Sequence, residues 1–87
     1  MARITDKRFQ QTFGRTPQTK VLDQVWHHRD DGINIKELSK LIRNSYVYTV
    51  NIVNDLAERE LVVKEAVGRE ALVRPNESNP VIKNIVH

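Results

Sequence analysis

Residues 33–75 decide the fold, and they read INIKELSKLIRNSYVYTVNIVNDLAERELVVKEAVGREALVRP. The first part carries a helix start signal, because the capping residue Asn34 is followed three residues later by Glu37. Apolar residues then recur at helical spacing and form the expected buried stripe: Leu38, Leu41 and Ile42. The pattern predicts a short helix over 35–42.

A second helix is expected directly after a tight turn. Arg43-Asn44 turns the chain, and Ser45 is a favourable N-cap, so this helix should run from residue 46 to near Arg59. Its inward stripe is expected to contain four residues: Thr49, Ile52, Val53 and Leu56.

The sequence period changes after residue 60. Residues 61–67 and 70–74 are rich in valine and leucine and flank Gly68-Arg69, which predicts a two-stranded hairpin around a glycine turn. Pro75 should end the second strand, because proline has no N–H to donate to a strand ladder.

Two helices are expected before this stretch. Thr16-Pro17 is a cap followed by proline at the first helical position, and it predicts a helix over 17–29. A two-turn helix at 6–13 is expected upstream, with Thr5 as its cap and Gly14 as its stop. So short a helix needs docked side chains, which Phe9 and Phe13 can supply.

A last helix is expected at the C-terminus. Asn79-Pro80 repeats the cap-plus-proline signature. The stripe that follows contains Val81, Ile82, Ile85 and Val86. This stripe is wide for so short a helix, so it should either pack back on Phe9 and Phe13 or pair with the same helix of a second chain.

Composition narrows the class of protein. The 87 residues are enough for one small domain, and at 39% apolar and 29% charged they read as a soluble globular chain. No apolar run exceeds three residues, so neither a membrane span nor a secretory signal is expected. The absence of cysteine excludes disulfides and thiolate metal sites and favours a cytoplasmic location.

The positive charge is unevenly placed. Residues 1–15 carry Arg3, Lys7, Arg8 and Arg15 against Asp6 alone, which accounts for the whole formal charge of +3. Residues 16–87 are electrically balanced. A basic arm is common on nucleic-acid binders, although a solvated tail has the same composition.

The predicted order of helix, short helix, turn, helix and hairpin is that of a winged helix-turn-helix. Residues 21–77 resemble the winged-helix domains of MarR-like and related small archaeal and bacterial transcriptional regulators. The residues that carry the resemblance lie in three segments: Ile35 to Ser39, Asp55 to Val62 and Gly68 to Arg74.

The resemblance implies a mostly helical α+β fold with a three-helix core, a two-stranded wing and terminal helices. It divides the chain into a basic arm or short helix at 1–15, a DNA-binding domain at 16–77 and a candidate dimerisation helix at 78–87. The chain departs from the family pattern at Glu60, where relatives usually place a glycine in the left-handed conformation. Either Glu60 adopts that conformation at a cost of about 1 kcal/mol, or the helix before it ends in a different way.

The resemblance further implies that the helix from 46 to 59 enters the major groove of double-stranded DNA. Its N-terminal half lacks lysine and arginine, which is a second departure. Asn51 and Asn54 suit paired hydrogen bonds to adenine, and Val47 or Val50 suits a thymine methyl group. Tyr46 and Tyr48 are expected to donate to phosphates, beside the capping Ser45.

Basic residues outside this helix complete the predicted DNA surface. Arg69 at the hairpin tip is expected at the minor groove, whose negative potential in A·T-rich sequence attracts arginine. Lys64 and Arg74 flank it on the strands, and Lys36 and Arg43 lie where phosphates are expected to pass. A solvated hairpin tip and a solvated helix face are the alternative readings.

The sequence therefore favours a small DNA-binding transcriptional regulator, a repressor rather than an activator, dimeric through its terminal helices. The alternative is a winged helix that docks a protein through its two tyrosines and two valines; an architectural DNA binder ranks third. No enzyme is expected, because no nucleophile with a base, paired carboxylates or glycine-rich phosphate loop is present. No cofactor or metal is expected either, since His27 and His28 point about 100° apart on a helix.

Overall fold

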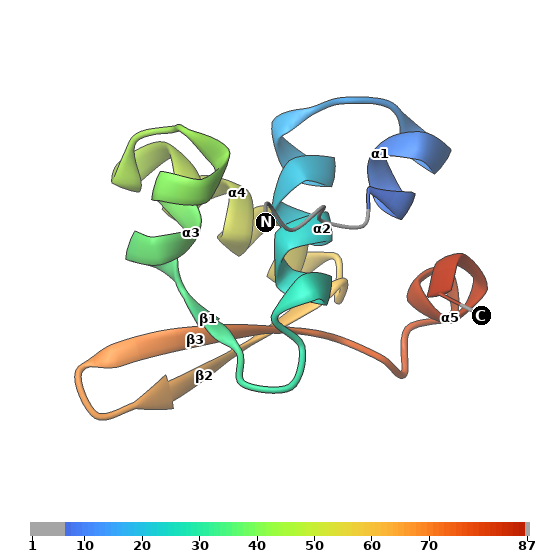
Figure 1. Ribbon diagram of the computed structural model, residues 1–87. Helices are drawn as coiled ribbons and strands as arrows, with labels where there is room; N and C mark the ends of the chain where they lie inside the picture. The colour runs from blue at the N-terminus through green and yellow to red at the C-terminus, as the bar shows by residue number, and fades with distance from the viewer. Residues whose placement is uncertain (1–6, 87) are drawn as a thin grey trace, which may run out of the picture.

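The computed structural model describes residues 7–86, and Figure 1 shows their arrangement. Five helices and three strands follow one another in this part of the chain: α1 (Arg8–Phe13), α2 (Pro17–His27), β1 (Ile33–Asn34), α3 (Ile35–Ile42), α4 (Tyr46–Glu58), β2 (Val62–Val67), β3 (Glu70–Pro75) and α5 (Pro80–Val86). Helices α2, α3 and α4 pack on one another, and the sheet lies along one side of them (Figure 1). Helices α1 and α5 contact each other at the opposite end from the hairpin tip.

The predicted helix starts are confirmed by their capping bonds. The Thr16 hydroxyl accepts the Thr19 N–H at 3.2 Å, and the Thr19 hydroxyl in turn accepts the Thr16 N–H at 2.9 Å. Asn34 Oδ1 accepts the Glu37 N–H at 2.8 Å at the start of α3. Ser45 Oγ accepts the Tyr48 N–H at 3.1 Å at the start of α4. These side chains satisfy amides that have no partner within their own helix.

Two helix ends require a left-handed residue that is not glycine. Arg43 after α3 has φ 59° and Glu60 after α4 has φ 60°. At the second end, the Leu61 N–H donates to the Leu56 carbonyl at 2.9 Å and the Glu60 N–H to the Ala57 carbonyl at 3.0 Å. This pair of bonds is the Schellman motif. Of the two helix ends left open by the sequence at Glu60, the structure has the left-handed one.

The sheet has three strands, one more than predicted. Its order is β1-β3-β2, and all pairs are antiparallel. Ile33 lies opposite Val73, and both side chains are buried. No sequence signal predicts β1, because a two-residue strand has no alternation of its own and is defined only by its pairing with β3.

The buried stripe of α3 differs from the prediction at one position. Leu41 is 43% exposed, whereas Ser39 is buried and its hydroxyl donates to the Lys36 carbonyl at 2.7 Å. That bond satisfies the hydroxyl and lets a small polar residue occupy the core-facing side. The stripe of α4 is as predicted, with Thr49, Ile52, Val53 and Leu56 all buried.

The terminal helices dock on the body of the same chain. Asp23 of α2 is buried, and its carboxylate accepts the N–H groups of Phe9 at 2.9 Å and Gln10 at 3.2 Å. This long-range cap fixes the start of α1. The predicted cap, Thr5, lies outside the described residues. Phe9 is buried, but Phe13 is 53% exposed, so only one of the two phenylalanines docks fully.

Helix α5 packs most of its apolar stripe against the core of the same chain. Ile82 is fully buried, and Ile85 and Val86 are half-buried against the core. Arg8 of α1 donates to the Val86 carbonyl at 3.3 Å. Val81 alone of the four stripe residues remains exposed, at 45%. Of the two arrangements open from sequence, packing back on α1 is the one present in the single chain.

Candidate nucleic-acid interface

The outer face of α4 carries most of the residues predicted to read DNA. Tyr46, Val47 and Tyr48 are 55%, 69% and 44% exposed, and Asn51 is also exposed one turn further on. Val50 is half-buried and packs against the core, so Val47 presents the more accessible methyl groups. The first two turns of α4 thus present two phenols, one valine and one amide without a charged side chain.

Two predicted site residues bind each other. Lys64 on β2 donates from Nζ to Asn54 Oδ1 on α4, so the amide of Asn54 is held toward β2 by this bond. Paired recognition of adenine needs both a donor and an acceptor on the amide. Asn51, which has no such partner among the described residues, is therefore better placed for that role. The Lys64–Asn54 contact crosses from helix to strand, and no local sequence signal indicates it.

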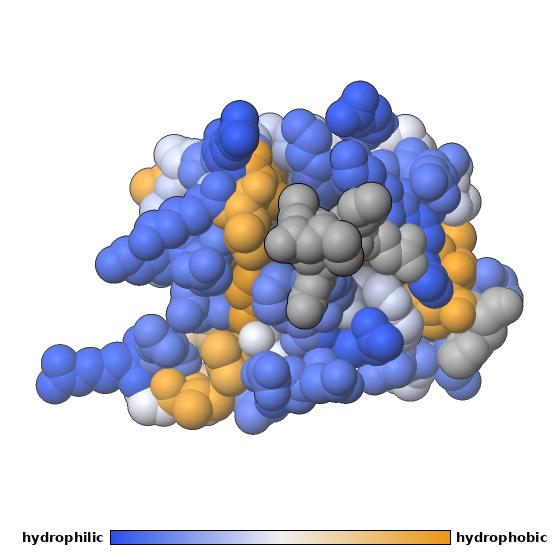
Figure 2. Space-filling view, viewed as in Figure 1, coloured by the Kyte–Doolittle hydropathy of each residue, from blue (hydrophilic) through white to orange (hydrophobic). Residues whose placement is uncertain are grey.

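Three of the predicted site residues line a hollow between the hairpin tip and the starts of α3 and α4. Lys36, Tyr46 and Arg69 line it together, with Glu70 as the carboxylate of the set. Its volume is about 320 Å³. Figure 2 shows the surface notched at this edge of the molecule, between the hairpin and the helices. Three residues that lie far apart in sequence thus face one space.

Arg43 and Arg74 lie outside that hollow. Arg43 is exposed at the other end of α3, and Ser45, also exposed, uses its hydroxyl oxygen to cap α4. Arg74 donates to the carbonyl oxygens of Asp30 at 3.0 Å and Asp31 at 3.4 Å, and it pairs with Glu65 at 3.4 Å. Arg74 therefore fixes the loop after α2, and its expected place beside Arg69 on the DNA surface is not supported by these contacts.

The two adjacent histidines lie at the C-terminal end of α2. His28 Nδ1 lies 2.9 Å from the Gln24 carbonyl oxygen at the end of α2, and the ring planes of His27 and His28 are 80° apart. Within residues 7–86, no three histidine or acidic side chains group as a metal site would require. No helix in the same range is long and apolar enough to span a membrane.

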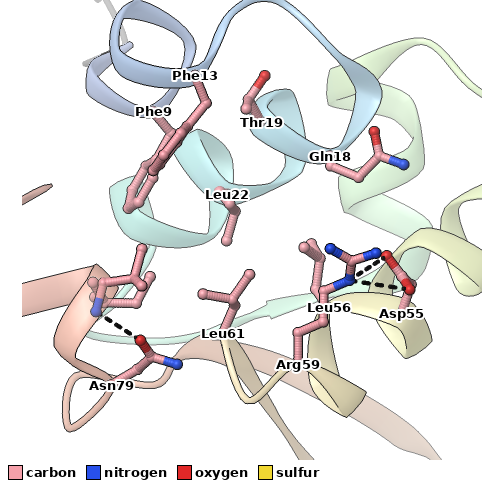
Figure 3. A pocket seen from close by; sticks show the side chains of 12 residues that line it. Phe9, Phe13, Gln18, Thr19, Leu22, Asp55, Leu56, Arg59, Leu61 and Asn79 are labelled. Atoms are coloured by element: carbon pink, nitrogen blue, oxygen red, sulfur yellow. Dashed lines mark hydrogen bonds and ion pairs between the residues drawn. The ribbon is translucent and has the colours of Figure 1, made fainter.

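An apolar groove lies on the other side of α4 (Figure 3). It has a volume of about 540 Å³, and its apolar walls come from α1 (Phe9 and Phe13), α2 (Leu22), the link between α4 and β2 (Leu61) and α5 (Val81). Its polar rim includes Arg59, which pairs with Asp55 at 3.3 Å (Figure 3). The two exposed apolar residues of the terminal helices, Phe13 and Val81, both line this groove.

A three-helix core with a tight turn between its last two helices and an antiparallel hairpin after them is a winged helix-turn-helix. The fold predicted from the sequence is therefore confirmed. Neither a protein-family model nor a curated protein sequence matches the chain. Solved structures do match it.

The matching structures include transcription regulators. MepR, a transcription regulator of the Staphylococcus aureus multidrug efflux pump MepA, is 15% identical with a TM-score of 0.73, covering 94% of this chain and 62% of its own. A MepR variant bound to an oligodeoxyribonucleotide gives the same values. SPO1453, a MarR family regulator from Silicibacter pomeroyi DSS-3, is 24% identical with a TM-score of 0.64, covering 90% of this chain and 56% of that one. This chain thus has the winged-helix fold of MarR-family regulators and spans about three fifths of their length or less.

Proposed function

We propose that this protein binds double-stranded DNA as a transcriptional regulator, with α4 in the major groove and the β2–β3 hairpin at the adjacent minor groove. The observation that carries the proposal is the convergence of Lys36, Tyr46 and Arg69 on one hollow beside the exposed face of α4. Two cations and a phenol in that position suit the phosphate backbone between the two grooves. The DNA-bound MepR variant, which has the same fold, adds support.

Base recognition rests on the first turns of α4. Asn51 is exposed and suits adenine, and the exposed Val47 suits the methyl group of thymine. Arg69 at the hairpin tip suits the narrow minor groove of A·T-rich sequence. The preferred sites are therefore A·T-rich, and regulation is by repression, since occupying a promoter requires contacts with DNA alone.

The regulator acts as a homodimer joined through its terminal helices. In the single chain the groove between α1 and α5 leaves Phe13 and Val81 exposed, and a second copy would cover them. Two-fold symmetry then matches two half-sites about 10 bp or a multiple of 10 bp apart.

The test is a fluorescence anisotropy titration with a labelled duplex from the region upstream of the gene and a random duplex of equal length. Wild type, Arg69→Ala and Lys83→Ala are compared, the last as a control on α5. Tight, salt-sensitive binding that prefers the upstream duplex and weakens only in Arg69→Ala supports the proposal. Equal binding to both duplexes indicates an architectural binder, and no binding at low salt contradicts the proposal.

One observation favours a protein partner instead. Tyr46, Val47 and Tyr48 form an exposed, largely apolar patch at the start of α4, and no cation lies among them. Such a patch also suits a protein groove. If DNA binding fails, this patch is the surface on which to test protein docking.

A further inference from the structure

Four basic side chains surround a second hollow at the end of α3 away from the hairpin. Lys7 precedes α1, Arg15 lies between α1 and α2, Lys20 is on α2, and Arg43 is in the turn before α4. The hollow has a volume of about 500 Å³, and Gln10 and Gln24 add neutral amides to its lining. The four cations come from separate segments, so only the fold brings them together.

No carboxylate offsets these charges within the described lining. Asp23 is the acidic residue on the adjoining turn of α2, but it is buried and its oxygens accept the Phe9 and Gln10 N–H groups. Among residues 7–86, no ion pair joins Lys7, Arg15, Lys20 or Arg43 to an acid. Like charges that line one hollow repel one another, and an anion placed among them offsets that repulsion.

We propose that this hollow binds phosphates of the DNA backbone that flank the segment read by α4. The inference rests on the proposed function and extends its footprint. Arg43 is two residues before the Ser45 cap of α4, so the basic hollow is continuous with the first turn of the helix that enters the major groove. Lysine and arginine that neutralise phosphates release counterions and supply affinity without sequence preference.

The form of the hollow favours a backbone over a small anion. Of its four basic residues, Lys7, Arg15 and Arg43 are exposed and Lys20 is half-buried, so none is a buried donor. The sole buried side-chain nitrogen or oxygen without a hydrogen bond in residues 7–86 is Arg74 Nε, which is not among the lining residues. An enclosed site for a free anion is expected to hold such donors; an open set of cations fits a strand that passes across it.

The experiment measures how DNA affinity depends on salt, with the labelled upstream duplex as probe. Lys20→Gln is compared with Lys83→Gln. The second variant removes the same charge from an exposed position of α5, away from the hollow. Each phosphate contact contributes about −0.9 to the slope of log Kobs against log salt. Lys20→Gln is expected to make the slope shallower by about 0.9, and Arg15→Gln combined with Lys20→Gln by about 1.8. Lys83→Gln should leave the slope unchanged.

The charge-preserving pair Arg15→Lys and Lys20→Arg should retain the wild-type slope, which separates lost charge from lost folding. A wild-type slope in the double glutamine variant overturns this inference, and so does an equal change in Lys83→Gln. If the double glutamine variant keeps the wild-type slope but Arg69→Ala still weakens binding, the flanking site is overturned and the proposed function stands. Absence of wild-type binding overturns both.

Discussion

Arg43 and Glu60 each hold a left-handed backbone at the end of a helix, and each is a residue for which that conformation is unfavourable. Hydrogen bonds to the backbone of Glu60 offset the cost of this conformation. The Glu60 carbonyl oxygen accepts the side-chain amides of Asn76 at 2.7 Å and Asn79 at 2.9 Å, which join the end of α4 to the start of α5. The strained residue is thereby fixed by two amide donors that reach it from later in the chain.

Replacing Glu60 with glycine is expected to stabilise the fold by about 0.5–1 kcal/mol, because glycine adopts positive φ without a steric cost. The backbone carbonyl that Asn76 and Asn79 bind is unchanged. Glu58→Gly, two residues earlier and inside α4, is the matched control and should destabilise by up to about 1 kcal/mol. Urea denaturation of the two variants checks the opposite signs, and a loss of stability in both would contradict this account of Glu60.

Asp23 is the residue that holds α1 on the body of the chain. Asp23→Ala leaves the Phe9 and Gln10 N–H groups without their acceptor, and the expected loss is about 1–3 kcal/mol. Hydrogen exchange at these two amides should accelerate markedly. Asp31→Ala, which removes an exposed carboxylate, serves as the control. Unchanged exchange in Asp23→Ala would show that the other contacts of α1, such as Phe9 packing and the Arg8–Val86 bond, hold the helix without the Asp23 cap.

At the scale of the elements, sequence signals were reliable where they were local. Thr16, Asn34 and Ser45 each cap a helix within three residues of their own position, and all three bonds form. Strand β1 and the Asp23 cap depend on partners 40 and 14 residues away in sequence respectively, so no window of the sequence contains them. The exposure of Leu41 was missed for a related reason, because helical spacing does not decide which edge of a stripe meets the core.

The sequence names candidate DNA contacts, which remain predictions, but it does not predict how they are arranged in space. The sequence identified Lys36, Tyr46 and Arg69 as separate candidates, and the fold brings them to one hollow. It also named Asn54 and Lys64 as independent contacts, whereas they bind each other. Lys20 was not proposed at all, because its basic neighbours are assembled only by the packing of α1, α2 and the α3–α4 turn.

The two asparagines of α4 provide a test at the same scale. Asn51→Ala is expected to lose about 1–3 kcal/mol of discrimination for an A·T pair in the half-site, because its exposed amide is available for paired hydrogen bonds. Asn54→Ala should change preference less, since its oxygen already accepts from Lys64. Anisotropy titrations over duplexes that differ at single base pairs measure both effects. Equal loss of preference in both variants would contradict this assignment.

For the whole molecule, the proposed dimer depends on the apolar groove between the terminal helices. Phe13→Glu places a charge in that groove and is expected to shift the protein from dimer to monomer. Val63→Glu on β2, at similar exposure and away from the groove, should leave the mass unchanged. Sedimentation equilibrium distinguishes the species, and a wild-type protein that is monomeric at all concentrations would exclude the dimer.

In the proposed complex, one face of the molecule contacts DNA, and it is formed by the start of α3, the start of α4 and the hairpin tip. Titration of ¹⁵N-labelled protein with the upstream duplex, followed by the amide shifts of each residue, measures this face directly. We expect little change in the amide shift of Val81, which lies in the opposite groove. The largest shift changes are expected at Lys36, Tyr46, Val47, Asn51 and Arg69. Changes confined to the groove of Phe13 and Val81, or no changes at low salt, would contradict the proposed complex.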